Sequence, residues 1–204
     1  IKELMFFQNQ SVLVTGATGL VGSNLIPRLL AEGAVVRATV HREQPVTPDD
    51  RVQYVQADLT MAEDCRRVVD GQQLVFMCAA TTSGAGAVAT TPMIHVTPNV
   101  LMNTLILDAA YQAGVKKFLW LGSTTGYPPS GQREVKEEEM FDGEPYEAYY
   151  FSGWMKRFSE TMCRMYGEKL ARPMTTIVLR PTNIYGPHDD FEPATSHVTP
   201  ALIR

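Results

Sequence analysis

Apolar runs and amphipathic stretches alternate along the chain, and this alternation predicts an α/β domain. Five short runs are rich in Val, Ile, Leu and Phe and end near glycine, proline or small residues, which is typical of strands. Three longer stretches carry apolar residues at helical spacing. The strands are expected at residues 11–16, 34–40, 73–80, 116–123 and 174–181, and the helices at 19–33, 98–115 and 152–167.

The order of these elements indicates the fold class. Strands and helices follow one another with short connections, which predicts parallel strands joined by right-handed helical crossovers. We therefore expect a Rossmann-type, doubly wound parallel sheet. In such a sheet ligands bind at the carboxyl ends of the strands, where the long polar segment 124–147 also begins.

Composition removes several classes of function. The 204 residues are 45% hydrophobic and 20% charged, which is enough for one buried core. A net charge of -4 argues against a nucleic-acid partner. No apolar stretch is long enough to span a membrane, and residues 1–10 do not look like a secretory signal. Cys65, Cys78 and Cys163 have neither metal-site nor disulfide spacing, so we expect reduced thiols, no metal and a cytoplasmic protein.

A glycine triplet provides the first candidate site. Gly16, Gly19 and Gly22 stand in "VLVTGATGLVGSNL", between an expected strand and an expected helix. Glycine lets the backbone turn tightly and approach a pyrophosphate, and the helix N-terminus offers free N–H groups to that anion. This context predicts a dinucleotide-binding turn.

The end of the second expected strand indicates which dinucleotide. His41 and Arg42 follow Val40, and the first acidic residue is Glu43. A carboxylate here would select the ribose hydroxyl of NAD, whereas an arginine can grip the 2′-phosphate of NADP. We therefore expect NADP rather than NAD, with a solvated surface pair as the alternative.

These motifs together resemble those of the extended short-chain dehydrogenase/reductases, the NAD-dependent epimerase/dehydratase family. "TGATGLVG" is similar to that family's phosphate loop, "ADL" to its adenine-binding segment, "CAA" to its strand end by the ribose, and "LGSTTGYP" to its catalytic-serine segment. The resemblance implies that the cofactor is bound by Gly16, Thr18, Gly19, Leu20, Val21, Gly22, His41, Arg42, Asp58, Leu59, Ala79, Ala80, Asn99, Lys156 and Pro181.

The C-terminal stretch from Arg180 resembles an NADP-dependent branch of this family, the GDP-L-fucose synthases. The resemblance implies that Thr124 and Asn183 lie by the sugar and that His197 serves as an acid in epimerisation and contacts substrate. Two residues depart from the branch: Thr125 stands in place of a catalytic cysteine, and Thr18 in place of a phosphate-loop arginine.

The family's chains are longer than this one. We therefore expect a cofactor domain at residues 1–182, followed at 183–204 by the start of a small substrate lobe. Either a fragment or a natural truncation would explain the length.

The catalytic helix carries the largest departure from the family. Its pattern is Tyr-x-x-x-Lys, in which the lysine favours the phenolate and the phenol exchanges a proton with the sugar. Lys156 is present, but Ser152 stands four residues earlier. Three hypotheses follow: Tyr149 or Tyr150 supplies a hydroxyl; Ser123, Thr125 and His197 move protons without a phenol; or redox chemistry has been lost. In each, Lys156 binds the nicotinamide ribose.

The expected function is that of an NADP-dependent epimerase/reductase or dehydratase acting on a nucleotide sugar. The alternative is a non-catalytic NADP-binding regulator or interaction module. The resemblance also implies a homodimer through the helices at 99–114 and 152–167, with burial in the core as the alternative for their apolar residues. Those residues are Leu101, Leu105, Trp154, Met155, Phe158, Met162 and Met165.

Overall fold

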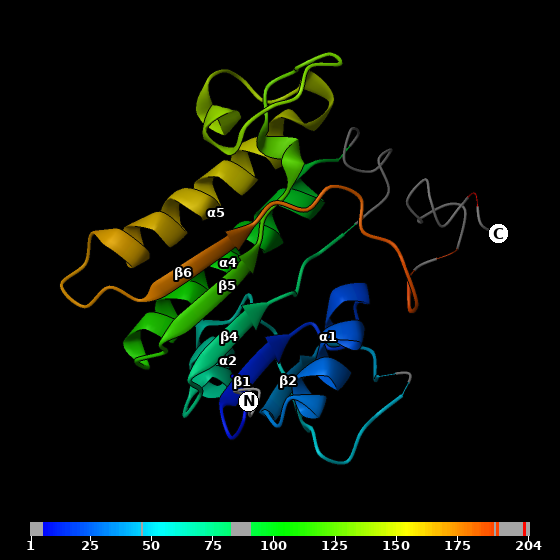
Figure 1. The fold of residues 1–204 in the computed structure, drawn as a ribbon, viewed down its shortest axis with the longest axis vertical. Helices are drawn as coiled ribbons and strands as arrows, with labels where there is room; N and C mark the ends of the chain where they lie inside the picture. The colour runs from blue at the N-terminus through cyan, green and yellow to red at the C-terminus, as the bar shows by residue number, and fades with distance from the viewer. Residues whose placement is uncertain (1–5, 46, 83–90, 190, 192–201, 203–204) are drawn as a thin grey trace, which may run out of the picture.

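The computed structural model describes residues 6–45, 47–82, 91–189, 191 and 202, and these form one α/β unit around a parallel sheet (Figure 1). Every neighbouring strand pair within them is parallel, in the order β3-β2-β1-β4-β5-β6. The strands are β1 (Ser11–Thr15), β2 (Val35–Val40), β3 (Gln53–Gln56), β4 (Leu74–Met77), β5 (Lys117–Leu121) and β6 (Thr175–Leu179).

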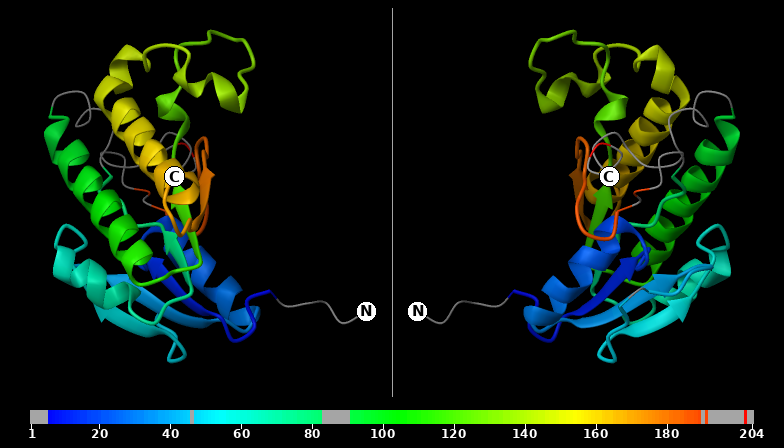
Figure 2. Two further views of the ribbon diagram at one scale, coloured as in Figure 1. Left: turned by 90° about the vertical axis from the view of Figure 1, so that its left-hand side faces the viewer. Right: turned by 90° about the vertical axis from the view of Figure 1, so that its right-hand side faces the viewer.

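Both faces of the sheet are covered, in separate layers (Figure 2). The helix α1 (Leu20–Ala31) packs on one face, whereas α2 (Ala62–Val69), α4 (Met93–Gln112) and α5 (Tyr150–Glu168) cover the other. Short 3-10 turns, η1 (Thr124–Gly126), η2 (Glu137–Phe141) and η3 (Glu147–Tyr149), connect β5 to α5. This arrangement confirms the predicted doubly wound fold.

Alternation along the strands divides the core into two clusters. Val12 and Val14 of β1 face α1 and belong to one cluster with Ile26 of that helix. Leu13 faces the three-helix layer and belongs to the other cluster, with Phe118 of β5. A parallel sheet buried on both faces needs apolar residues at nearly every strand position, and this is why the runs in the sequence are continuous.

The structure corrects the expected elements at four points. It adds β3 and α2, which the sequence analysis did not anticipate, because both are short and polar and depend on pairing with β2 and packing on α4. α4 begins at Met93 and runs through Pro98, where a start was expected. α5 begins at Tyr150 rather than Ser152 and ends at Glu168, past Gly167.

The strand order changes direction between β1 and β4, where ligands bind in sheets of this kind. From β1 the chain continues to β2 on one side, and from β4 to β5 on the other. The glycine turn follows β1 and the segment Cys78–Ala80 follows β4, so both meet at this edge. Within the part of the chain that the structure describes, no helix has the length and apolar character to cross a membrane.

Candidate functional site

The glycine turn after β1 has a shape that only glycine allows. Gly16 has φ +72°, and a Cβ there would lie 2.8 Å from the Cα of Ala79. A Cβ on Gly22 would lie 2.2 Å from the carbonyl oxygen of Gly16. The turn is therefore pressed between the β4 end and the first turn of α1, and the backbone at its rim stays open to a ligand.

The N-terminus of α1 fits an anion. Gly19 is the N-cap residue, no side chain caps the helix, and its first turn holds no acidic residue. Thr18, Leu20 and Val21 belong to this same turn, so their backbone amides surround the helix start. Uncapped N–H groups and the positive end of the helix dipole suit a pyrophosphate, as the sequence predicted.

Hydrogen bonds fix the end of β4 beside the glycine turn. The Thr15 Oγ1 accepts bonds from the backbone N–H groups of Cys78 and Ala79, both at 3.0 Å. Asn99, buried in α4, accepts a bond from the Thr81 N–H at 3.0 Å and donates to the Thr81 carbonyl at 2.9 Å. Asn99 therefore holds the chain just beyond Ala80, and its direct contact with a cofactor stays a prediction.

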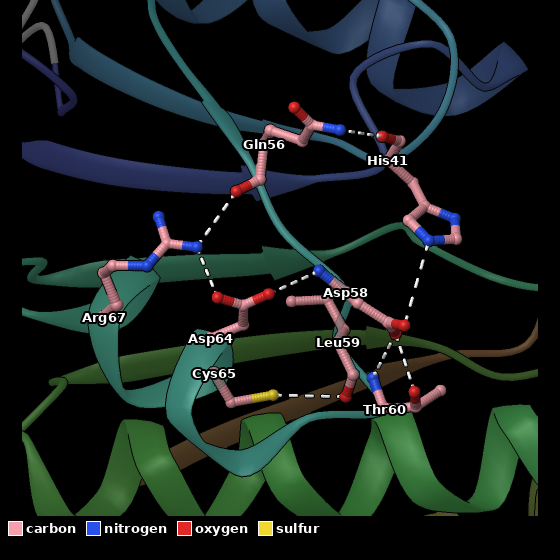
Figure 3. A network of polar contacts seen from close by, with 8 residues as sticks. All are labelled: His41, Gln56, Asp58, Leu59, Thr60, Asp64, Cys65 and Arg67. Carbon is pink, nitrogen blue, oxygen red and sulfur yellow. Dashed lines mark hydrogen bonds and ion pairs between the residues drawn. The ribbon is translucent and has the colours of Figure 1, made fainter.

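Hydrogen bonds in a polar network after β3 hold the Asp58 carboxylate in place (Figure 3). Its Oδ1 accepts bonds from the Thr60 N–H at 2.9 Å and the Thr60 hydroxyl at 2.7 Å. The Asp58 N–H donates to Asp64 at 2.7 Å, and Asp64 in turn pairs with Arg67. These bonds from Thr60 lower the pKa of Asp58, so the carboxylate is charged at neutral pH. Sequence reasoning missed Thr60 and Asp64, although the Asp-x-Thr spacing of a side-chain-to-backbone turn signals the first.

His41 and Arg42 reach the same corner from the end of β2. The His41 Nε2 lies 3.9 Å from the Asp58 Oδ2, and its carbonyl accepts a bond from Gln56 (Figure 3). Arg42 is exposed and forms no hydrogen bond or ion pair with the described residues. Its guanidinium is thus available for a phosphate, whereas His41 is near a carboxylate. Leu59 has a buried side chain, so only its backbone can face a cofactor.

A second group of polar residues gathers where β5 meets α5. The Ser123 Oγ accepts bonds from the Thr125 N–H at 3.2 Å and the Thr125 hydroxyl at 3.1 Å. The Thr124 N–H donates to the Pro181 carbonyl at 3.4 Å, which joins the ends of β5 and β6. A Cβ on Gly153 would lie 2.6 Å from the Thr125 carbonyl oxygen, so glycine lets α5 approach this turn closely.

Lys156 is half-buried beside the same turn. Its Nζ donates to the Leu121 carbonyl at 3.2 Å and lies 5.0 Å from the centre of the Trp120 ring. No carboxylate of the described residues pairs with it. Burial lowers the pKa of Lys156 from its ordinary 10.5 to about 8. Such an amine exchanges protons readily near neutral pH.

Ser152 and the neighbouring tyrosines differ sharply in burial. Ser152 is buried, and its hydroxyl has no hydrogen-bond partner among the described residues. Tyr149 is 37% exposed and caps α5, and Tyr150 is 39% exposed. Their rings pack on Tyr146 and Phe151, respectively. Whether either phenol reaches a substrate stays a prediction.

The segment after β6 returns to the glycine turn. The Asn24 side chain of α1 donates to the Pro187 carbonyl at 2.8 Å, and Asn183 is exposed on the way there. His197 lies outside the described residues. No group of His, Cys, Asp or Glu suited to a metal occurs among the residues that the structure describes.

Fold and site together define a Rossmann-type dinucleotide-binding protein. The sequence profile of the NAD dependent epimerase/dehydratase family matches residues 12–204, and the chain belongs to this family. It is 31% identical over 201 residues to GDP-L-fucose synthase of Escherichia coli K12, covering 96% of this chain and 57% of that enzyme. It is 35% identical to a probable GDP-L-fucose synthase 1 of rice, covering 95% of this chain and 56% of that one.

A solved structure shares the fold. The GDP-L-fucose synthetase from Naegleria fowleri bound to NADP superposes with a TM-score of 0.74 at 26% identity, covering 96% of this chain and 61% of that one. The chain thus spans little more than half the length of the relatives it matches.

Proposed function

We propose that this protein is an NADP-dependent epimerase/reductase or dehydratase acting on a nucleotide-linked sugar. Family membership and the GDP-sugar relatives support this activity. The observation that carries it is the meeting of two groups at one sheet edge. The cradle of Gly16 and Gly22 follows β1, and Ser123, Thr125 and Lys156 cluster at the end of β5.

The roles of the chain's own residues follow from their chemistry. A bound nicotinamide would supply or accept a hydride. Ser123 carries a hydroxyl that can hold the reacting sugar oxygen, and Thr125 orients that hydroxyl through its own bond. Lys156 binds the nicotinamide ribose and holds a proton with a pKa near 8. Asn183, Thr124 and His197 are the proposed contacts to the sugar.

NADP is the proposed cofactor, with Arg42 as the residue that selects it. The exposed guanidinium and the absence of an acidic residue directly after β2 support this choice. Asp58 is the proposed partner of the adenine amino group, because its Oδ2 accepts no hydrogen bond from the described residues and has only the His41 Nε2 nearby, at 3.9 Å.

We also infer a homodimer, a substrate lobe beginning at residue 183 and a cytoplasmic location. Met155 is buried, and Leu105, Met162 and Met165 pack against the core, so these four need no partner. Phe151, Leu101, Trp154 and Phe158 remain exposed on α4 and α5 and support a helix-to-helix interface. Three free cysteines suit a reducing compartment.

The experiment pairs cofactor binding with turnover. NADPH should bind, and its absorbance should fall when a GDP-linked 4-keto sugar is added. A protein that binds NADPH, leaves the absorbance constant and leaves the sugar unchanged would instead be the non-catalytic NADP-binding regulator. Ser152→Tyr separates the cases further, since turnover gained by that variant would identify Ser152 as the site of a lost function.

The exposed phenol has its own test. Tyr149→Phe keeps the ring and removes the hydroxyl. A strong loss of turnover in this variant would show that the Tyr149 hydroxyl exchanges the proton with the sugar. Full activity would show that Tyr149 has no part in proton transfer.

A further inference from the structure

Two arginines bind the turn that carries the candidate catalytic hydroxyls, and neither belongs to the proposed cofactor site. Arg157 of α5 is 2% exposed, and the side chain of Arg180, the first residue after β6, is 17% exposed. Taking a charge out of water is costly, so buried charges occur where a partner or a role offsets that cost. The contacts of each guanidinium show what it holds.

Arg157 binds the backbone of η1. Its Nε donates to the Gly126 carbonyl at 2.7 Å. The guanidinium carbon lies 4.9 Å from the centre of the Trp154 ring and 5.5 Å from that of the Phe141 ring. No carboxylate of the described residues forms an ion pair with it. The two rings and the carbonyl orient the guanidinium, so Gly126 is held at one place on α5.

Arg180 joins three elements at the other end of the same turn. Its Nε and Nη2 bind the two carboxylate oxygens of Glu160 in α5, at 3.0 and 2.5 Å. Its Nη1 donates to the Tyr127 hydroxyl at 2.7 Å and to the Glu137 carbonyl at 2.5 Å. A bidentate arginine–carboxylate pair has a fixed geometry, so it sets where Tyr127 lies relative to α5.

The backbone carries these contacts into the turn. The Tyr127 N–H donates to the Thr124 carbonyl at 3.0 Å. The Thr124 N–H donates at 3.4 Å to the carbonyl of Pro181, the residue that follows Arg180. Both ends of η1 are therefore linked to Arg180, and its last residue is linked to Arg157.

The candidate chemistry depends on where this turn lies relative to α5. Ser123 and Thr125 belong to the turn, whereas Lys156 belongs to α5, between the anchoring residues of both contacts. A misplacement of about 1 Å can cost about 100-fold in rate. A buried ion pair, in contrast, adds little stability over apolar residues of the same volume. Placing the hydroxyls against the amine is thus the role that these contacts fit.

We propose that Arg157 and Arg180 are positioning residues of the reaction, which hold the turn of Ser123 and Thr125 in place against Lys156. This rests on the proposed function, because it names what keeps that site assembled. Both arginines act through the turn and exchange no proton themselves. Loosening either contact should slow the chemical step and leave cofactor binding at the glycine turn unchanged.

The first test measures single-turnover oxidation of NADPH by a GDP-linked 4-keto sugar. Tyr127→Phe removes one hydroxyl bond to Arg180 and keeps both the ring and the ion pair with Glu160. The reaction should be at least about tenfold slower, with the NADPH affinity and the denaturant midpoint close to those of the wild type. Arg157→Lys and Arg180→Lys keep the charge but lose the planar fork, and they should slow it further.

The matched control is a second tyrosine hydroxyl on α5. Tyr166→Phe removes a bond to Asp108 of 3.0 Å. Tyr166 follows Lys156 by ten residues, which is about 15 Å along the helix axis. This variant should react at the wild-type rate. An equal loss of rate in both tyrosine variants would overturn the proposal, because it would show a general effect on α5.

The second test needs neither cofactor nor activity. Hydrogen–deuterium exchange of the intact, unloaded protein reports the amides of Thr125 and Tyr127, which donate to the Ser123 hydroxyl and the Thr124 carbonyl. They should exchange at least about threefold faster in Tyr127→Phe, whereas the amides of β1 should exchange as in the wild type. Unchanged exchange in the turn, or an equal increase in β1, would overturn the proposal.

The two tests separate this inference from the proposed function. Wild-type rates in Tyr127→Phe and in both arginine variants would refute the positioning role and leave the enzyme as proposed. If the wild-type protein neither oxidises NADPH nor changes the sugar, the proposed function is wrong. The positioning role then fails with it, even where the exchange shows that the arginines hold the turn.

Discussion

The cofactor cradle and the α4–α5 contact lie at the same edge of the sheet, yet they differ in how their polar groups are satisfied. Around the cradle, Thr15 and Asp58 bind the backbone that they hold in place. On α4 and α5, the His95 Nδ1 and the Ser152 Oγ are buried and have no hydrogen-bond partner among the described residues. The comparison indicates that the polar groups around the glycine turn are paired within the fold, whereas the Ser152 hydroxyl, at the position where the family's catalytic tyrosine is expected, is not.

The largest effect should come from breaking the cradle. In Gly16→Ala the new Cβ meets the Ala79 backbone, and NADPH affinity should fall at least about 100-fold, or roughly 2.7 kcal/mol. Gly71→Ala is the matched control, because Gly71 has φ +71° but nothing within 4 Å of its Cβ position. Both variants should lose about 1–2 kcal/mol of stability to the left-handed backbone. If calorimetric titration gave equal NADPH affinities for the two variants, the glycine turn would not be the pyrophosphate site.

The next effect concerns the half-buried ammonium of Lys156. Its folded-state pKa of about 8 is below the ordinary 10.5, so below pH 8 the native state carries a desolvation penalty that the unfolded state lacks. Lys156→Met should therefore be more stable than wild type by up to about 3 kcal/mol at neutral pH, and this gap should close between about pH 8 and 10.5.

Denaturant unfolding across that pH range checks the sign. The exposed Lys169→Met, on the residue that follows α5, is the control and should give a difference that does not change with pH. A Lys156→Met gap that widens above pH 8 would show that the amine is not destabilised by burial.

A tenfold effect is expected at the cofactor's 2′-phosphate. Arg42→Ala should weaken NADPH binding about tenfold, or about 1.4 kcal/mol, and leave NADH binding unchanged. The comparable exposed arginine on α1, Arg28, should tolerate alanine without either change. Equal affinities of the wild-type protein for NADPH and NADH would show that Arg42 does not select the cofactor.

The smallest effect concerns the hydrogen bonds that Thr60 donates to Asp58. Thr60→Val removes the 2.7 Å hydroxyl bond and should raise the pKa of Asp58 toward its ordinary value. Because a lowered carboxylate pKa stabilises the fold above that pKa, acid unfolding should begin at a higher pH in the variant. Cofactor binding should weaken by about 1 kcal/mol or less. An unchanged acid transition would show that Thr60 does not act on Asp58.

The sequence predicted those features that are local. The glycine spacing, the apolar runs of five strands and the place of Lys156 are each written within a few residues. β3 and α2 were not predicted from the sequence, because their stability comes from neighbours far along the chain. The contact between α4 and α5, which includes the Asn103–Ser159 bond, depends on the register of two helices, and no local pattern encodes it.

The most direct test of a redox enzyme without the usual phenol is the transfer of deuterium from labelled NADPH. The protein is mixed with NADPH carrying deuterium at the nicotinamide C4 and with a GDP-linked 4-keto sugar, and the sugar is then analysed by mass spectrometry. We predict one deuterium on the reduced carbon of the sugar, in the wild type and in Tyr149→Phe alike. Unlabelled sugar recovered from wild-type protein that has bound NADPH would contradict it.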